Sequence, residues 1–147
     1  MRIRLATTAD IPALMALEKH AATAAHWSTE QHETAFSSEA PSRVVLIVEQ
    51  DGVQGFITAR ALGEEWEIEN IAVAEPARRR GLGTRLLAEF LDLARARGAD
   101  TVFLEVRESN LPARRLYEKW AFVESGRRKR YYREPEEDAI VYQIGFA

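Results

Sequence analysis

Residues 78–84 of this chain read Arg78-Arg79-Arg80-Gly81-Leu82-Gly83-Thr84. The run before them, Glu67–Val73, has the composition of an extended strand, and apolar residues recur at helical spacing in the run after them, Arg85–Arg97. Glycines let the backbone approach an anion closely, the N–H groups of a first helical turn point toward it, and arginines add positive charge. The stretch therefore predicts a turn between a strand and a helix that holds a phosphate group.

The glycine spacing excludes two common nucleotide-binding motifs. A P-loop needs lysine directly after its second glycine, whereas Gly83 is followed by Thr84 and Arg85. A dinucleotide-binding turn needs glycine or alanine three residues after its second glycine, where this chain has Leu86. What remains is Arg/Gln-x-x-Gly-x-Gly/Ala, which the stretch satisfies from Arg78 onward and which resembles the coenzyme A loop of the GNAT acyltransferases. Taken alone, the motif fits a basic turn at an exposed helix start equally well.

Composition limits the remaining possibilities. With 147 residues, 46% of them hydrophobic, the chain suits one compact domain over residues 1–147. It has no cysteine, which excludes disulfides, a thiol nucleophile and cysteine-ligated zinc. His20, His26 and His32 do not have the i, i+4 spacing of a helical metal pair, so no metal site is expected. No segment approaches the ~20 apolar residues of a membrane span, and we expect a cytoplasmic protein.

The net charge of −3 is unevenly distributed along the chain. Residues 78–80 and 127–130 are basic runs, whereas residues 64–69 and 134–138 are rich in carboxylates. Clustered arginines usually form solvated surface, and without a long basic stripe or an aromatic platform direct nucleic-acid binding is not expected. The acidic runs fit either solvated loops or a surface that holds a basic peptide tail.

The hydrophobic pattern predicts a mixed α/β sheet, with hairpins in the middle of the chain and helices alternating with strands toward its end. Thr7 and Asp10 resemble a capping box ahead of a helix that extends to about Ala24, and Ser28 is expected to cap a second helix. The Asp51-Gly52 pair favours a tight hairpin turn. Strands are expected at Arg2–Leu5, Val44–Glu49, Val53–Ala61, Glu65–Val73, Thr101–Arg107, Phe122–Arg130 and Ile140–Phe146, and further helices at Ser28–Phe36, Arg85–Arg97 and Leu111–Trp120.

One expected strand contains an irregularity. In Glu65–Val73 apolar residues alternate up to Ile68 and again from Ile71, so the period of two slips by one residue at Glu69-Asn70. A β-bulge inserts one such extra residue and bends the strand away from its neighbour. The bend would open a gap in which a ligand can meet backbone groups, although an edge strand with an irregular pattern also explains the slip.

A second motif is longer and more specific than the glycine stretch. Residues 104–110 read Leu-Glu-Val-Arg-Glu-Ser-Asn, and Tyr117 stands seven residues after Asn110. Together with Asn70-Ile71-Ala72-Val73 and the glycine stretch, this motif resembles the RimI branch of the GNAT superfamily, and the resemblance covers most of the chain. It implies a GNAT fold: a mixed central sheet of about six or seven strands, one of them bulged and splayed, with about four helices.

The resemblance also implies an activity. RimI-type enzymes transfer acetyl from their substrate acetyl-CoA to the amino-terminal alanine of a small-subunit ribosomal protein, without an acyl-enzyme. Carried over by position, Glu105 is expected to be the general base and Tyr117 the general acid. The chain departs from the family at His26, where proline is usual before Trp27-Ser28, and at Trp120-Ala121, where Leu-Gly is usual. Residues expected to contact coenzyme A are Ile71, Ala72, Val73, Arg78, Arg79, Arg80, Gly81, Leu82, Gly83, Thr84, Asn110 and Tyr117.

Acyl transfer from a thioester to an amine needs a neutral amine, a polarised carbonyl and a stabilised thiolate. Glu105 can take the amine proton, unless it is a surface carboxylate paired with Arg107. Tyr117 can donate to the sulfur, because a phenol of pKa ~10 is roughly matched to a thiol of pKa ~8.5, unless its ring only packs. A backbone N–H within Ile71–Val73 is expected to polarise the carbonyl, and Glu69 is a rival base.

The pKa of the acceptor amine limits which class of amine the protein can acetylate. An α-amine of pKa ~7.8 loses its proton at a cost roughly 3.5 kcal/mol lower than a lysine of pKa ~10.4, so a lone carboxylate base fits a protein amino terminus better than a lysine. Two alternatives stay open. One is a GNAT enzyme that acts on a small-molecule amine or a different protein amine, and the other is a non-catalytic acyl-CoA sensor.

Overall fold

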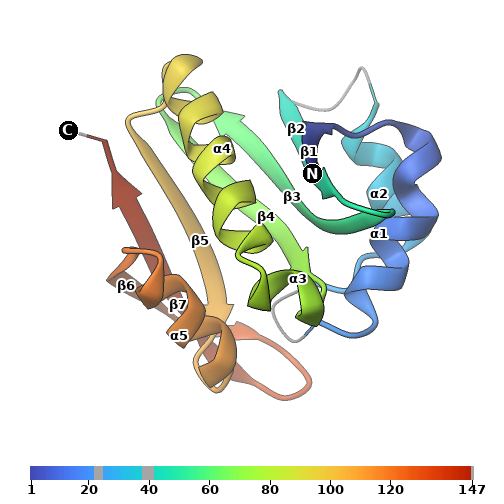
Figure 1. Ribbon diagram of the computed structural model, residues 1–147. Helices are drawn as coiled ribbons and strands as arrows, with labels where there is room; N and C mark the ends of the chain where they lie inside the picture. Colours follow the sequence, from blue (N-terminus) through green and yellow to red (C-terminus); the bar gives the residue numbers. More distant parts are fainter. Residues whose placement is uncertain (22–24, 38–41, 147) are drawn as a thin grey trace.

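A computed structural model describes residues 1–21, 25–37 and 42–146, without the side chains of Arg78 and Arg79. Seven strands form a mixed sheet in the order β1-β2-β3-β4-β5-β7-β6, in which β4 and β5 pair in parallel and the other neighbours pair antiparallel (Figure 1). The predicted mixed α/β fold is confirmed. The strands are β1 (Arg2–Leu5), β2 (Arg43–Glu49), β3 (Val53–Leu62), β4 (Glu65–Val73), β5 (Thr101–Arg107), β6 (Val123–Tyr132) and β7 (Glu137–Gly145). The helices are α1 (Ile11–Glu18), α2 (Thr29–Ala35), α3 (Glu75–Arg79), α4 (Leu82–Ala96) and α5 (Leu111–Lys119), with a 3₁₀ turn at Thr8–Asp10.

Helices cover both faces of the sheet. Because side chains alternate along a strand, successive residues of β2 join different cores. Leu46 and Val48 pack with α4 and α5, whereas Val45 and Ile47 pack with α1 and α2. Figure 1 shows α4 lying along β3 and β4 on the first of these faces. The sheet thus has an α4/α5 face and an α1/α2 face.

The first helix is shorter than predicted. Helix α1 ends at Glu18 instead of about Ala24, and residues 22–24 lie outside the described residues. The alanines after Glu18 favour helix on propensity alone. The buried Glu18 carboxylate, however, accepts the backbone N–H of Trp27, so the chain must turn back at this point. The predicted caps are confirmed: Asp10 accepts from the Thr7 N–H at 2.8 Å, and Ser28 caps α2.

A short helix that the sequence did not predict precedes the glycines. Helix α3 carries the backbone of Arg78 and Arg79, so Gly81 connects two helices and not a strand and a helix. Pro76 is tolerated in its first turn, and with five residues α3 is too short to show a helical period. Helix α4 begins at Leu82, earlier than predicted, with Gly81 as its N-cap at φ 75°.

Strand β4 is bulged as predicted. Its register with β3 shifts at Glu69, the extra residue between Ile68 and Asn70. The parallel pairing with β5 stops just before the bulge: the last paired residues are Glu67 and Phe103, although both strands continue. The strands therefore diverge toward their carboxyl ends, and the space between them forms the site.

Candidate active site

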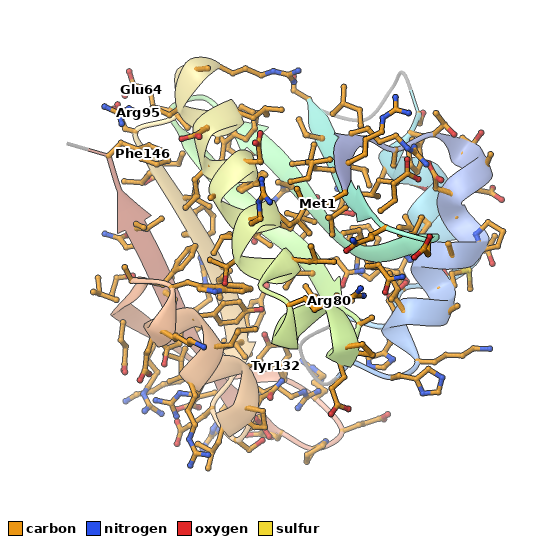
Figure 2. All side chains as sticks on the ribbon, in the orientation of Figure 1. Met1, Glu64, Arg80, Arg95, Tyr132 and Phe146 are labelled. Atoms are coloured by element: carbon orange, nitrogen blue, oxygen red, sulfur yellow. The ribbon has the colours of Figure 1, made fainter. Side chains whose placement is uncertain are left out.

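A cleft of about 870 Å³ lies where β4 and β5 diverge. Its lining brings together Glu105 and Tyr117, the expected base and acid, with Asn110 and Ile71 from the expected coenzyme contacts. Figure 2 shows Tyr132, another lining residue, at the same end of the molecule as Arg80 of the glycine stretch. Within the described residues, Ala72, Val73 and residues 80–84 are not part of this lining, and the glycine stretch is linked to α5 through Thr84, which accepts from Trp120.

Glu105 and Tyr117 come from different faces. In β5, Leu104 and Val106 belong to the core under α4 and α5, so the alternation places Glu105 on the α1/α2 face. Tyr117 lies on α5, which covers the other face. A molecule that occupies the gap between the strands can therefore meet a carboxylate on one side and a phenol on the other.

Glu105 is a cleft carboxylate with 9% of its side chain exposed. Its Oε1 lies 2.7 Å from Nε of Arg128 on β6, so the predicted alternative of a pair with Arg107 is wrong. Arg107 instead donates to the backbone carbonyls of Arg133 and Pro135. In the sheet, β7 lies between β5 and β6, although β6 comes before β7 in the chain. The Glu105–Arg128 pair therefore could not be inferred from closeness in the sequence. A cationic amine must compete with this guanidinium for the carboxylate.

Two further carboxylates line the same cleft. Glu69, the rival base, forms a two-pronged ion pair with Arg43, with N···O distances of 2.8 and 3.0 Å. Glu67 accepts from Arg60 at 2.7 Å. Burial raises the pKa of Glu67 despite this contact, and the charges of Glu69 and Glu105 raise it further. No sequence motif marks Glu67 as a possible base, because only the splay of the strands places it in the cleft.

Tyr117 is buried, with 4% of its surface exposed. Its ring packs against Phe122 and Tyr142, with centroid distances of 6.0 and 6.2 Å, so the packing role considered for it is real. It also lines the cleft, and the two roles are compatible. Burial raises the pKa of Tyr117 above its ordinary value, so the phenol keeps its proton at neutral pH and can donate a hydrogen bond.

The glycine stretch has the form of an anion cradle. Gly83 is buried against β4: a Cβ there would meet the Val73 methyl groups at 3.2 and 3.3 Å. A Cβ on Gly81 would meet nothing within 4 Å, so the space outside this turn is open. Helix geometry gives the N–H groups of Leu82, Gly83 and Thr84 no partner inside α4, and among the described residues no side chain caps this end. Arg80 is exposed beside it.

Trp120, one of the departures from the family pattern, lies against this cradle. Its Nε1 donates to Oγ1 of Thr84 at 3.3 Å. A Cβ on Gly83 would lie 3.6 Å from the Trp120 ring. The indole therefore joins the end of α5 to the first turn of α4.

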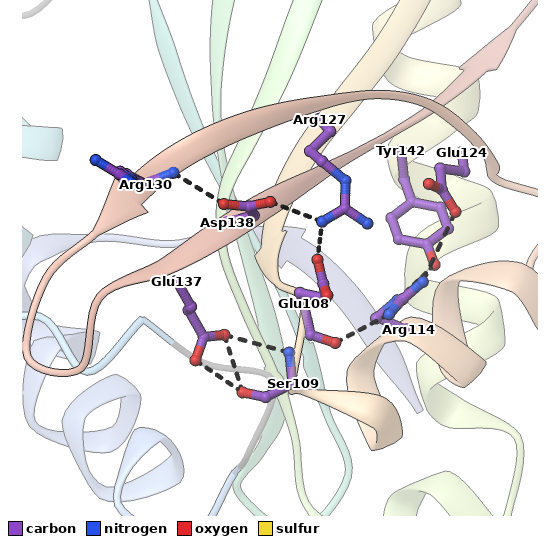
Figure 3. A network of polar contacts seen from close by, with 9 residues as sticks. All are labelled: Glu108, Ser109, Arg114, Glu124, Arg127, Arg130, Glu137, Asp138 and Tyr142. Atoms are coloured by element: carbon purple, nitrogen blue, oxygen red, sulfur yellow. Dashed lines mark hydrogen bonds and ion pairs between the residues drawn. The ribbon is translucent and has the colours of Figure 1, made fainter.

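The β5–α5 connection is held by a polar network (Figure 3). Asn110 caps α5 by accepting from the Ala113 N–H at 3.2 Å, which occupies its side-chain oxygen. Ser109 donates to Glu137 of β7 at 2.9 Å, and Arg114 donates to the carbonyl of Glu108 at the same distance. These contacts fix the start of α5, and with it Tyr117, relative to the strand that carries Glu105.

The chain resembles characterised proteins in sequence and in structure. The model of the acetyltransferase (GNAT) family matches residues 11–122. The chain belongs to the GNAT acetyltransferase family. The [ribosomal protein bS18]-alanine N-acetyltransferase of Salmonella typhimurium is 35% identical over 97% of this chain and 95% of its own. The crystal structure of the Escherichia coli ribosomal-protein-S18-alanine N-acetyltransferase aligns with a TM-score of 0.83 and 32% identity over 99% of this chain and 94% of that one.

GNAT acetyltransferases use acetyl-CoA. A GNAT acetyltransferase from Elizabethkingia anophelis with acetyl-CoA bound shares the fold of this chain, with a TM-score of 0.77 at 22% identity over 99% of this chain and 97% of that one. None of the described helices is long and apolar enough to cross a membrane. Within residues 1–21, 25–37 and 42–146, no group of three His, Cys, Asp or Glu side chains is arranged as a metal site.

The charged runs of this GNAT chain meet each other. Arg127 of β6 contacts both Glu108 and Asp138, and Arg130 pairs with Glu136 at 3.2 Å. The hydrogen bond from the Arg130 N–H and the Arg127 contact hold the pKa of Asp138 below its usual range. In the acidic run at 134–138, Glu136 and Asp138 thus pair within their own hairpin and Glu137 accepts from Ser109, which weakens the expectation that this run holds a basic peptide tail.

Proposed function

We propose that this chain transfers acetyl from acetyl-CoA to the α-amine of a protein amino terminus, with the alanine of ribosomal protein bS18 as the acceptor. The observation that carries the proposal is the cleft that Glu105 and Tyr117 both line, from opposite faces of the sheet. The named relative at 35% identity supports the choice of acceptor. A ribosomal acceptor implies that the reaction takes place in the cytoplasm, and residues 1–147 are taken as one catalytic domain.

Glu105 accepts the proton of the acceptor ammonium on the α1/α2 face, after the ammonium has displaced Arg128. The neutral nitrogen then attacks the thioester carbonyl, so that a C–N bond forms and the C–S bond breaks. A backbone N–H of Ile71–Val73 is placed to polarise the carbonyl oxygen. One of the two protons left on the nitrogen goes to solvent as the amide forms, and the other stays as the amide N–H.

Tyr117 stabilises the departing sulfur from the α4/α5 face. Its raised pKa widens the gap to a thiol of pKa ~8.5. A hydrogen bond from the phenol to the developing thiolate therefore fits better than complete proton transfer. The thiolate then takes its proton from solvent, and Tyr117 keeps its own.

The coenzyme end of the cleft is assigned to the glycine cradle. The N–H groups of Leu82, Gly83 and Thr84 suit a pyrophosphate, because α4 has fifteen residues and its N-terminus carries partial positive charge. Arg78, Arg79 and Arg80 add charge, and Val73 and Ala72 lead the chain into this turn. Asn110 borders the cleft at the start of α5.

The test is an acceptor screen with acetyl-CoA and purified protein. Peptides that begin with Ala, Ser or Met and an amino-terminally blocked peptide with one Lys are compared with polyamines and amino acids. We expect the Ala peptide to be acetylated fastest. Turnover of small amines alone would support a GNAT enzyme of different specificity, and coenzyme binding without turnover of any amine would support a sensor.

A further inference from the structure

A buried polar cluster that the chemistry does not use lies beside the cleft. Tyrosines aside, four polar or charged side chains are buried in the described part of the chain, and Glu18, His32 and Asn70 are three of them, at 1–2% exposure. Glu18 Oε1 contacts His32 Nε2, and Glu18 Oε2 accepts from Asn70 Nδ2 at 3.2 Å. Glu18 and His32 do not line the cleft, so neither is placed to touch a substrate.

The cluster is hydrogen-bonded to residues 25–27, a segment that lines the cleft. The acceptor wall, defined here as Ala25, His26 and Trp27, borders the cleft on the α1/α2 face. The Ala25 N–H donates to Asn70 Oδ1 at 2.9 Å, and the Trp27 N–H donates to Glu18 Oε2. The Trp27 ring also packs on His32, with a centroid distance of 5.3 Å. The wall is therefore bonded to the cluster at two alternate backbone positions.

The bulge is what brings Asn70 to this cluster. Ile68 and Ile71 both face the α4/α5 core although they are three positions apart. If Glu69 occupied a regular position in the strand, Asn70 would stand two positions after Ile68 and would face that core too. The bulge at Glu69 turns Asn70 to the α1/α2 face, where it reaches Glu18. The irregularity that separates β4 from β5 thus also anchors the opposite wall of the cleft.

Because the cluster is buried, breaking its hydrogen bonds to the acceptor wall is energetically costly. A buried carboxylate is tolerated only when its oxygens are hydrogen-bonded, and leaving one unsatisfied costs about 1–3 kcal/mol or more. Movement of the acceptor wall would remove the Trp27 N–H from Glu18 and the Ala25 N–H from Asn70. The wall is therefore held at a fixed distance from the bulge.

We infer that Glu18, His32 and Asn70 are positioning residues that hold the acceptor wall and so set the acceptor side of the cleft. The inference rests on the proposed function, because it assigns the α1/α2 side to the acceptor. It does not involve the coenzyme side, since the cradle at Gly81 and Gly83 belongs to α4.

The test compares Glu18→Ala with Glu18→Gln. Glu18→Ala should raise the KM for the acceptor by about tenfold or more, which corresponds to about 1.4 kcal/mol, and leave kcat and the KM for acetyl-CoA within about twofold. Glu18→Gln keeps the shape and one accepting oxygen, and should recover most of the loss. Thr58→Val is the matched control: Thr58 is equally buried opposite Asn70, and within the described part of the chain its hydroxyl has no partner. It should change neither KM.

Hydrogen exchange separates the inference from the proposed function. In Glu18→Ala the Ala25 and Trp27 amides should exchange at least about tenfold faster, with α4 unchanged. If Glu18→Ala does not fold, His32→Gln is measured in the same way and should shift both readouts in the same direction. The inference would be overturned if kcat fell and both KM values rose by similar factors, or if the exchange rates of these amides did not change. A wild-type protein that acetylates no amine would refute the proposed function alone, because the exchange result still stands.

Discussion

Three glutamates line the cleft, and they differ in how easily their arginine partners can be displaced. Glu69 is held by two bonds from Arg43, and Glu67 is held by Arg60. Glu105 is paired with Arg128, whose side chain is 55% exposed and so is the easiest of the three to displace. At this scale the geometry therefore favours Glu105 as the base.

Substitution of each glutamate by glutamine tests this ranking. Glu105→Gln should lower kcat by about 100-fold or more, the usual contribution of a general base, whereas Glu67→Gln and Glu69→Gln should lower it by less than about tenfold. Coenzyme affinity, measured by calorimetry, should stay within about twofold in all three variants. A larger loss in Glu67→Gln than in Glu105→Gln would assign the base to β4 instead.

His26 adopts a backbone conformation that proline cannot adopt. Its φ is 56°, in the left-handed region that costs a residue with a Cβ roughly 1–2 kcal/mol, whereas proline fixes φ near −65°. His26→Pro should therefore lower the free energy of unfolding by about 2 kcal/mol or more, and His26→Gly should leave it unchanged or slightly higher. Urea unfolding of both variants provides the measurement. A His26→Pro variant as stable as the wild type would contradict the left-handed backbone at this residue.

Residues of a local motif could be assigned to the cleft from the sequence, and contacts set by distant pairing could not. Glu105 and Tyr117 belong to one continuous motif, and both lie in the cleft. The partner of Glu105 comes from β6, and the wall that faces it comes from residues 25–27. Which residues meet there depends on the bulge, which the slip of the apolar period at Glu69-Asn70 did indicate, and on the strand order, which leaves no signal near the residues themselves.

Helix α5 carries Tyr117 on its buried side, and this makes stability depend on pH. The folded-state pKa of Tyr117 is raised by burial, so its contribution is fully present below the unfolded value of about 10 and is lost as pH rises above it. Each pH unit in this range removes at most about 1.4 kcal/mol for one group. Tyr117→Phe should therefore lose less stability than the wild type between pH 10 and 11, as measured by urea unfolding. Tyr131, Tyr132 and Tyr142 also have raised pKa values, but they remain in both proteins. Identical slopes would contradict the assignment.

Three strands were predicted with their observed bounds, and the larger errors concern helices. The bounds of β1, β4 and β5 agree with the prediction, because their alternation is regular or interrupted at one position. Helix α3 was missed because it has five residues, and α1 was extended too far because buried contacts of Glu18 override the helix propensity of alanine. Tertiary contacts, and not local preference, decide both cases.

The whole molecule consists of two strand groups joined by a short parallel seam. Strands β1–β4 and β5–β7 meet through three paired residues of β4 and β5, and the cleft occupies the rest of the boundary. A ligand that spans from the α4 cradle to α5 therefore ties the two groups together. Binding of this kind also stabilises the native state by mass action.

Coenzyme A should consequently raise the thermal unfolding midpoint. At about 100 times its Kd the gain is about 2.7 kcal/mol, or roughly 5–10 °C for a domain of this size. Differential scanning calorimetry measures it, with ATP at the same concentration as the control for a generic phosphate ligand. The Glu105→Gln variant should show the same shift, because Glu105 lies on the acceptor side. An equal shift with ATP would show a cradle without preference for coenzyme A.

The central claim is acetyl transfer to an α-amine, and one experiment locates the acetyl group directly. A peptide with a free amino-terminal alanine and one internal lysine is incubated with the protein and acetyl-CoA, and tandem mass spectrometry assigns the modified nitrogen. We predict acetyl on the alanine α-amine and an unmodified lysine. Acetyl on the lysine alone, or an unmodified peptide under conditions in which a small-molecule amine is acetylated, would contradict the claim.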